Sequence, residues 1–301
     1  MDWQWHRDLD LGPLAEVWQA AAGTGSASVF QSYAFAQQWV RCFAGVAELR
    51  IAWRVAPPLI VPLVVRRGRL ELMGEGLFDY LDLIGAAGPG LEREAAELAL
   101  GLDWPKAQFT GIAAATRFGG FWRALGAEAQ PFATAPVRAA GAALDGEHRR
   151  LEARWRRAHP TLRLETEAGP RRQVLAWLLD HKARALAGRG EANVLGAAEQ
   201  RWLTAMVEHE PARCELWTLE RGGRRLSALL AWQNRGARYG YTLSYEEDAA
   251  ELSPGILLLF AVVRHTMNEG RSFHFLTGEQ AYKQRFATHG EPLLRYVVER
   301  P

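Results

Sequence analysis

The chain has 301 residues, of which 49% are hydrophobic and 23% are charged, and its formal net charge is +2. This length suits one large or two medium domains with sizeable cores, and the small net charge gives no reason to expect a DNA-binding protein. The two cysteines lack metal-like spacing, the first residues carry no secretion signal, and no apolar run is long enough to cross a bilayer, so we expect a cytoplasmic protein without a metal centre or a membrane span.

The first half of the chain alternates between runs of strand-like and helix-like periodicity. One strand-like run is interrupted by Gly74-Glu75-Gly76, and the half ends in a stretch of small residues at 139–142. Strands are predicted at 3–7, 49–55, 59–66, 70–83, 107–112 and 133–138, and helices at 14–22, 33–43, 91–100 and 118–125.

The second half opens with an arginine-rich helix and then repeats the same order of elements. Strands are predicted at 161–166, 214–220, 225–233, 237–245, 272–276 and 293–299, and helices at 146–158, 170–186, 197–208, 254–268 and 280–287. The repeated order predicts an α/β fold, with α+β mixed sheets, built from two similar domains at residues 1–145 and 146–301.

The helix that begins near residue 254 has a well-marked start. Ser253 is a candidate N-cap, and Pro254 suits the first helical position, where its missing N–H is not needed. The residues that follow are apolar almost all round, which predicts a buried helix. Because a helix N-terminus favours anions, we expect Ser253, Pro254, Gly255 and Ile256 to bind any phosphate of a donor substrate.

Three chemically useful side chains follow the strand predicted at 272–276. Glu279, Tyr282 and Lys283 lie within five residues of one another, at the end of a strand where α/β proteins place ligands. Lys283 is a candidate for stabilising an oxyanion or a donor phosphate, Tyr282 for protonating a leaving group, and Glu279 for accepting a proton. The structural alternative is a helix-capping glutamate followed by a surface tyrosine and lysine.

Two further candidates lie on the neighbouring strands. At period two, Tyr239, Tyr241, Leu243 and Tyr245 share one strand face, and Tyr245 lies at its carboxyl end, where a phenol can protonate a leaving group. His274, inside the strand RSFHFL, is a candidate general base near neutral pH. The alternatives are tyrosines that fill a half-buried strand and a histidine with its hydrogen bonds satisfied in the core.

The arginine-rich helix at 146–158 has two interpretations. Its five arginines surround Trp155, which would suit a patch that binds phosphate groups or nucleic acid. The alternative is a solvated helix that packs Leu151 and Trp155 on the core while the arginines stay in water.

Four stretches of the chain form recognisable motifs, of which the first two are the more specific. These motifs are Ser253-Pro254-Gly255-Ile256, Gly278-Glu279 with Tyr282-Lys283, Phe30-Gln31-Ser32 with Trp39, and Phe78-Asp79-Tyr80-Leu81-Asp82. In these motifs the chain resembles the GNAT N-acetyltransferases, and within them the CelD-like (BioF2-like) acetyltransferases, which are akin to the Fem-type aminoacyltransferases.

This resemblance implies two tandem GNAT-like domains and acyl transfer by the second. The donor would be acetyl-CoA or another acyl-CoA, and the acceptor a small molecule or a saccharide that carries an amine or hydroxyl. Four acidic residues precede Pro254, at positions 246, 247, 248 and 251, and they must point away from any bound phosphate. The alternatives are a Fem-like transferase that uses aminoacyl-tRNA and a catalytically silent GNAT-like module that binds a saccharide or a protein.

Overall fold

The computed structural model describes residues 2–24, 27–143, 146–193, 195–234, 236–278 and 280–300. They form two compact units. The first comprises Met1–Thr134 and Glu291–Pro301, and the second comprises Ala135–Gly290. The sequence placed its domain boundary between residues 145 and 146, and assigned the whole C-terminal end to the second domain.

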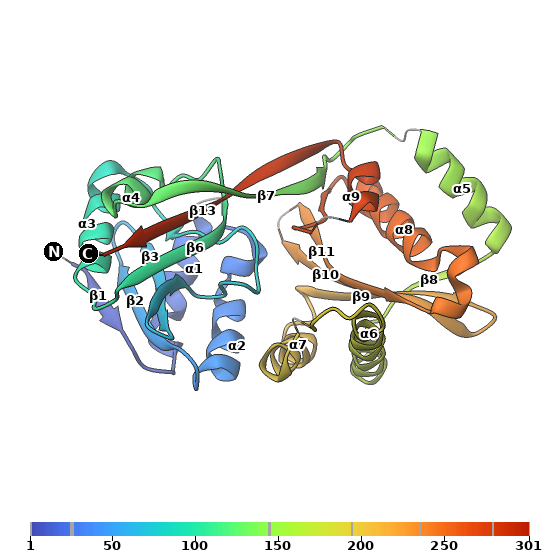
Figure 1. Cartoon of the computed structure of the whole chain (residues 1–301), viewed down its shortest axis with the longest axis horizontal. Coiled ribbons are helices and arrows are strands. Elements are labelled where there is room, and N and C mark those ends of the chain that lie inside the picture. The colour runs from blue at the N-terminus through green and yellow to red at the C-terminus, as the bar shows by residue number, and fades with distance from the viewer. Residues whose placement is uncertain are drawn as a thin grey trace. The chain divides into compact units, whose positions relative to one another are not determined.

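The first unit is built on a mixed sheet in the order β1-β2-β3-β4-β6-β13, with β5 paired to β3 (Figure 1). Strands β2, β3 and β4 form an antiparallel meander, and β4 then pairs with β6 in parallel. The strands are β1 (Gln4–His6), β2 (Glu48–Arg54), β3 (Leu59–Arg66), β4 (Arg69–Leu72), β5 (Ile84–Gly85), β6 (Lys106–Ala113) and β13 (His289–Glu299). The single long strand predicted at 70–83 is therefore wrong, because the Gly74-Glu75-Gly76 turn ends β4 and the chain resumes pairing only at β5.

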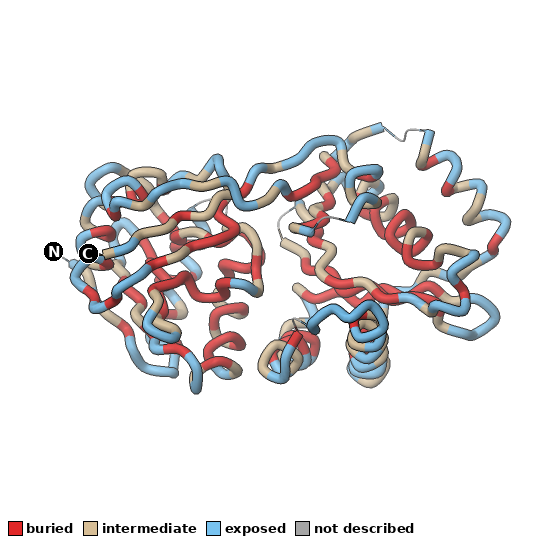
Figure 2. Tube along the Cα trace, viewed as in Figure 1, coloured by how far each residue is buried: buried red, intermediate tan, exposed pale blue. Residues whose placement is uncertain are grey.

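Four helices cover this sheet. They are α1 (Ala15–Gly23), α2 (Tyr33–Phe43), α3 (Pro89–Leu100) and α4 (Gly119–Ala124), joined by the 3-10 turns η1 (Gly12–Leu14) and η2 (Val29–Gln31). Helix α1 packs on β3 and β5, and α3 packs on α4. Figure 2 shows buried residues along the strands and along the helix faces that meet them. The side chains of Trp18, Trp104 and Trp122 are fully buried.

The second unit repeats this architecture around a sheet in the order β7-β12-β11-β10-β9-β8. Strands β9, β10 and β11 form an antiparallel meander, and β11 pairs with β12 in parallel, as β4 pairs with β6. The strands are β7 (Glu128–Arg138), β8 (Thr161–Leu164), β9 (Cys214–Arg221), β10 (Arg224–Asn234), β11 (Ala237–Tyr245) and β12 (Ser272–His274). The predicted α/β class with mixed sheets is confirmed.

Helices cover both faces of the second sheet. Helices α5 (Gly146–Ala158), α8 (Pro254–Asn268) and α9 (Ala281–Phe286) lie on one face, and α6 (Ala168–Gly188) and α7 (Ala197–His209) lie on the other (Figure 1). The 3-10 turn η3 (Glu247–Leu252) leads into α8. Leu258, Phe260 and Val262 of α8 are fully buried against Leu229 and Phe273 of the sheet, which confirms the prediction of a buried helix.

The last strand of each sequence half completes the sheet of the other unit. Strand β13 pairs with β6, from Leu293 opposite Ala113 to Glu299 opposite Lys106, so it belongs to the first unit. The end of β7 pairs with β12 in the second unit, with Arg138 opposite Phe273. Assigning the strand at 293–299 to the second domain was therefore wrong, because the periodicity of a strand does not reveal its partner.

Candidate active site

In the second unit the ladder between the parallel strands β11 and β12 is short, and we call the unpaired stretch beyond its carboxyl end the gap. Strand β11 pairs with β12 only from Ala237 opposite Ser272 to Tyr239 opposite His274. Within the described residues, β11 then continues to Tyr245 without further ladder pairs to β12. The carboxyl ends of neighbouring parallel strands, where they diverge, are the usual place for a ligand in an α/β fold.

A β-bulge near the middle of β11 determines which of its tyrosine side chains lie on the same face of the sheet. The register with β10 shifts between Leu230 and Ala231, which leaves Tyr241 as the extra residue. Tyr241 packs edge-on against Trp232 at 5.7 Å between ring centroids, and Trp232 packs on Trp202 of α7. The prediction that all these tyrosines share one face is therefore wrong, because an extra residue inverts the alternation of side chains beyond it.

Leu243 and Tyr245 instead face α8, and with it they form a pocket. The pocket has a volume of about 230 Å³ and is lined by Leu243, Tyr245, Ala250, Ser253, Gly255, Ile256 and Tyr282. The predicted anion-binding residues and two of the predicted catalytic residues therefore meet in one place. Pro254 lies between the lining residues Ser253 and Gly255, at the first position of α8.

The first turn of α8 is open to a ligand at this pocket. Ser253 is the positional N-cap, but it adopts the left-handed conformation (φ 48°, ψ 56°) and its side chain makes no capping bond, because the hydroxyl donates instead to the carbonyl of Ala250 at 3.5 Å. No acidic side chain lies in the first turn. The amides of Gly255 and Ile256 therefore keep the ability to bind an anion, which the helix dipole favours.

Because Gly255 has no side chain, a ligand can reach the first amides of α8 from the pocket. A Cβ at residue 255 would lie 3.0 Å from Leu243 Cδ2 and 3.0 Å from Tyr245 Cδ1. A larger residue there would crowd the two side chains that form the opposite wall. The sequence had identified Gly255 as part of a helix start that would bind a donor phosphate, and its close contact with β11 is visible only in the tertiary structure.

Tyr282 forms another wall of the pocket from α9. Its ring packs against the hydrophobic core of the unit. Burial raises the pKa of the Tyr282 phenol, and the nearby Tyr245 adds to the rise. A phenol with a raised pKa stays protonated at neutral pH, so Tyr282 is suited to donate a hydrogen bond or a proton.

The other candidates from the same turn are placed differently. Lys283 does not line the pocket; its ammonium donates a hydrogen bond to the carbonyl of Thr277, within the turn between β12 and α9. Glu279 lies outside the described residues. The structure therefore brings Tyr282 to the pocket and gives Lys283 a contact within the turn that carries Tyr282.

His274 lies at the last paired position of β12, on the other face of the sheet from the pocket. Its neighbours Phe273 and Phe275 face α8 and α9, so His274 points the opposite way. Its ring lies 4.7 Å from that of Tyr239, and its Nε2 lies 3.1 Å from the Ser272 hydroxyl. It therefore flanks the base of the gap, whereas Tyr245 and Tyr282 flank the pocket.

Two of the acidic residues ahead of α8 are held by ion pairs outside the pocket. Arg224 Nη2 donates to both carboxylate oxygens of Asp248 at 2.8 Å, and it lies 3.4 Å from Glu246 Oε2. The Nε2 of His181 lies 3.2 Å from Glu246 Oε1. None of these four residues lines the pocket, so the prediction that the acidic loop points away holds for Glu246 and Asp248.

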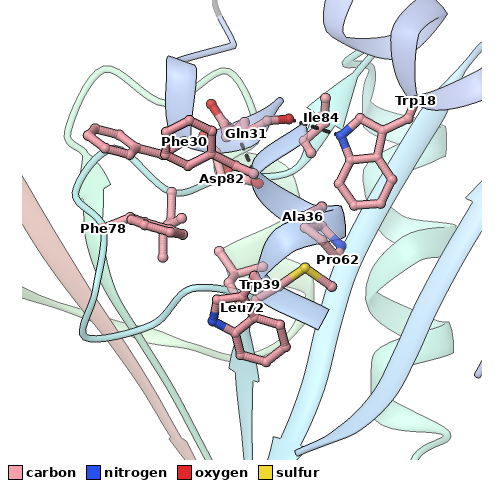
Figure 3. A pocket seen from close by; sticks show the side chains of 13 residues that line it. Trp18, Phe30, Gln31, Ala36, Trp39, Pro62, Leu72, Phe78, Asp82 and Ile84 are labelled. Carbon is pink, nitrogen blue, oxygen red and sulfur yellow. Dashed lines mark hydrogen bonds between the residues drawn. The ribbon is translucent and has the colours of Figure 1, made fainter. Parts of the chain in front are cut away.

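The first unit contains a second, narrower cavity, lined largely by aromatic rings (Figure 3). Its volume of about 20 Å³ offers room for about one water molecule. Asp82 lies at its edge and accepts hydrogen bonds from the Thr116 hydroxyl and from the amide of Leu83. Burial raises the pKa of Asp82 to about 7, a feature that the sequence does not reveal.

The described residues hold neither a metal-binding cluster nor a membrane-spanning helix. No group of three or more His, Cys, Asp or Glu side chains in these ranges is arranged to hold a metal ion. None of the helices in the described part of the chain is long and apolar enough to cross a membrane.

Comparison with known proteins extends this picture. Residues 144–284 match the family model described as "Acetyltransferase (GNAT) domain". No curated protein matches the chain.

Three solved structures have a similar fold over nearly the whole chain. The C-terminal DUF2156 domain of a protein named as a lysylphosphatidylglycerol synthetase, from Agrobacterium fabrum, has a TM-score of 0.66 at 16% identity, covering 94% of this chain and 92% of that one. FemX has a TM-score of 0.63 at 9% identity, covering 99% and 98%. A tandem GNAT protein from the clavulanic acid biosynthesis pathway has a TM-score of 0.51 at 15% identity, covering 99% of each chain. The chain therefore carries a GNAT domain at residues 144–284, and as a whole it has the fold of the tandem GNAT protein and of FemX.

Proposed function

We propose that the chain is an N-acyltransferase that takes its acyl group from acetyl-CoA or another acyl-CoA and passes it to an amine or sugar acceptor. One observation carries this proposal: the uncapped N-terminus of α8 opens into a pocket whose other walls include Tyr245 at the end of β11 and Tyr282 on α9. The family of residues 144–284 supports acyl transfer. The kinship with CelD-like acetyltransferases, which favours a saccharide acceptor, is part of the same proposal.

In this proposal the donor lies along the pocket from the helix to the strand gap. Its phosphate oxygens accept hydrogen bonds from the amides of Gly255 and Ile256, where the positive end of the helix dipole lies. Its thioester reaches the gap beyond Tyr239, where β11 makes no ladder bonds to β12 in the described residues. The apolar wall of Leu243 and Ile256 covers the donor arm between the two ends.

The transfer is a direct attack on the thioester. The acceptor nitrogen forms a bond to the carbonyl carbon, and the tetrahedral intermediate then expels the thiolate as the C–S bond breaks. Tyr282, whose phenol is protonated at neutral pH, or Tyr245 beside it gives its proton to the leaving sulfur. The proton lost by the acceptor nitrogen passes to a base, for which His274 beside the gap is the described candidate.

Lys283 has a different place in this scheme from the one that the sequence suggested. Its hydrogen bond to Thr277 closes the turn from which α9 presents Tyr282. We propose that Lys283 positions Tyr282, and its role at an oxyanion stays a prediction. A Lys283→Arg variant, which retains a cationic donor, should keep more activity than Lys283→Ala.

Titration calorimetry with acetyl-CoA tests the donor assignment, and thermal unfolding gives an independent reading. A ligand at about a hundred times its dissociation constant stabilises the folded protein by about 2.7 kcal/mol, which raises the melting temperature measurably. We expect heat and stabilisation with acetyl-CoA, and a weaker response with pantetheine, which lacks the phosphates that α8 binds. Absence of any response to acetyl-CoA and longer acyl-CoAs would overturn the assignment.

The second candidate is a transferase that uses aminoacyl-tRNA, and the surface of α5 is the observation that favours it. Arg149, Arg150, Arg156 and Arg157 are exposed on this helix, where a polyphosphate backbone can reach them. Arg150 and Arg156 also form ion pairs with acidic residues of α5 itself, which reduces the field of the helix. Gel-shift titration with tRNA tests this candidate; salt-sensitive binding that Arg149→Ala and Arg157→Ala together remove would favour it over acyl-CoA.

A further inference from the structure

The loop between β11 and α8 poses an electrostatic problem for the proposed donor. Four carboxylates precede the helix N-terminus, at positions 246, 247, 248 and 251. Carboxylates are themselves favourable ligands for the first amides of a helix. A free acidic loop beside Gly255 and Ile256 would therefore repel a donor phosphate and compete with it for the same amides.

An ion-pair clamp, formed by Arg224 with Glu246 and Asp248, holds two of these four carboxylates to the sheet. Arg224 begins β10, directly after a tight hairpin turn, and its guanidinium binds Asp248 through both carboxylate oxygens at 2.8 Å and reaches Glu246 at 3.4 Å. The other oxygen of Glu246 lies 3.2 Å from His181 Nε2 on α6. Glu246 is thereby held from two elements of the fold.

His181 is itself fixed in place. Its ring stacks on Trp177, with 3.7 Å between the ring centroids, and its Nδ1 lies 2.8 Å from the Trp177 carbonyl oxygen. Trp177 and His181 are one helical turn apart on α6, so the helix fixes the positions of both rings and thereby the contact of His181 with Glu246.

We propose that Arg224 is a positioning residue for donor binding, because its ion pairs keep Glu246 and Asp248 away from the amides of Gly255 and Ile256. This inference rests on the proposed function. Loss of the guanidinium frees Asp248 from its ion pair and leaves Glu246 held only by His181, and the acidic loop then inhibits donor binding from within the chain.

Because the Arg224–Asp248 ion pair is exposed, a role of Arg224 in donor binding can be distinguished from a role in the stability of the fold. The side chains of Arg224 and Asp248 are 53% and 63% exposed. Ion pairs at such exposure contribute little to the stability of a protein. An Arg224 variant should therefore melt near the parent, so that any change in ligand affinity reflects the site.

The experiment measures the affinities of coenzyme A and of inorganic pyrophosphate for the parent and for Arg224→Ala. We expect the dissociation constant of each anion to rise roughly tenfold in the variant, and Arg224→Lys to recover part of the loss. Arg221→Ala is the matched control, because Arg221 is the exposed residue directly opposite Arg224 in the register of the hairpin. It removes the same charge and leaves the clamp intact, so the affinity should stay near that of the parent.

Removing the carboxylates as well distinguishes the clamp from a direct contact. With Glu246→Gln and Asp248→Asn added to Arg224→Ala, the affinity should return to the parent value, because no released charge remains to compete. The deficit of Arg224→Ala alone should also shrink as salt is raised from about 0.01 M to about 1 M, where the screening length falls from about 30 Å to about 3 Å.

Each other outcome overturns a specific part of the argument. Equal affinities of the parent and Arg224→Ala would overturn the clamp and leave the proposed function standing. A triple variant as weak as Arg224→Ala would show that Arg224 binds the anion itself. Failure of the parent to bind coenzyme A while pyrophosphate binding follows the predicted pattern would overturn the proposed function alone, and no binding of either anion would overturn both.

Discussion

Gly255→Ala is the substitution that most directly tests the pocket at the start of α8. The added methyl carbon would lie 3.0 Å from Leu243 Cδ2 and from Tyr245 Cδ1. Carbon atoms in contact normally lie about 3.5–4.0 Å apart, so the two side chains must retreat by roughly half an ångström or more. Both side chains line the pocket, so the change is made where the donor is proposed to lie.

Two effects on stability oppose each other in this variant. Overpacking costs about 1–3 kcal/mol in a close-packed core. Here the cost should lie near the lower value, because the crowded atoms border an open pocket. Alanine is favoured over glycine within a helix by up to about 1 kcal/mol, which offsets it. We therefore expect a melting temperature close to that of the parent.

The effect on the donor should be larger. The methyl group narrows access to the amide of residue 255, and we expect the dissociation constant of acetyl-CoA to rise roughly tenfold, which corresponds to about 1.4 kcal/mol. Gly169→Ala is the control, because Gly169 is likewise the second residue of its helix, α6, and a Cβ there meets nothing within 4 Å. If calorimetry gave the same dissociation constant of acetyl-CoA for Gly255→Ala and for the parent, the reasoning would be refuted, because the donor would then not bind at the amide of residue 255.

Three further predictions concern the phenol, the buried ion pair and a buried acid. Tyr282→Phe keeps the aromatic ring in the pocket wall and removes the proton donor, so kcat measured by steady-state kinetics should fall roughly a hundredfold while the affinity for the donor stays unchanged. An unaltered kcat would exclude Tyr282 as the acid. Glu215→Ala should lower the free energy of unfolding in urea by at most about 3–5 kcal/mol, because Arg238, 1% exposed, loses the carboxylate that it binds at 2.6 and 2.9 Å and keeps that of Glu269 at 3.1 Å. A loss below about 1 kcal/mol would contradict this. Burial raises the pKa of Asp82 to about 7, above its unfolded value of about 3.9, so the folded state holds this proton more tightly and the free energy of unfolding should fall as pH rises between these two values. Asp82→Asn should flatten this fall between about pH 4 and about pH 7, and equal slopes for the variant and the parent would count against the raised pKa.

The sequence by itself determined the elements whose patterns are local. The helix predicted at 33–43 and the strand predicted at 237–245 have those bounds in the structure, because periodicity and flanking turn residues act within a few residues of each other. The start of α8 was also readable, since proline at a first helical position is a local signal. The repeated order of elements indicated two similar mixed sheets for the same reason.

The tertiary structure alone decided which strands pair and where side chains point. Strand β13 completes the sheet of the first unit by pairing with β6, about 190 residues earlier in the sequence, and no periodicity encodes that partner. The bulge opposite Leu230 and Ala231 separates Tyr241 from Tyr245, because one extra residue reverses the alternation beyond it. The Arg224 clamp joins a residue of β10 to the acidic segment after β11, and His181 of α6 holds the same segment, so the charge that this segment presents depends on partners that folding brings to it.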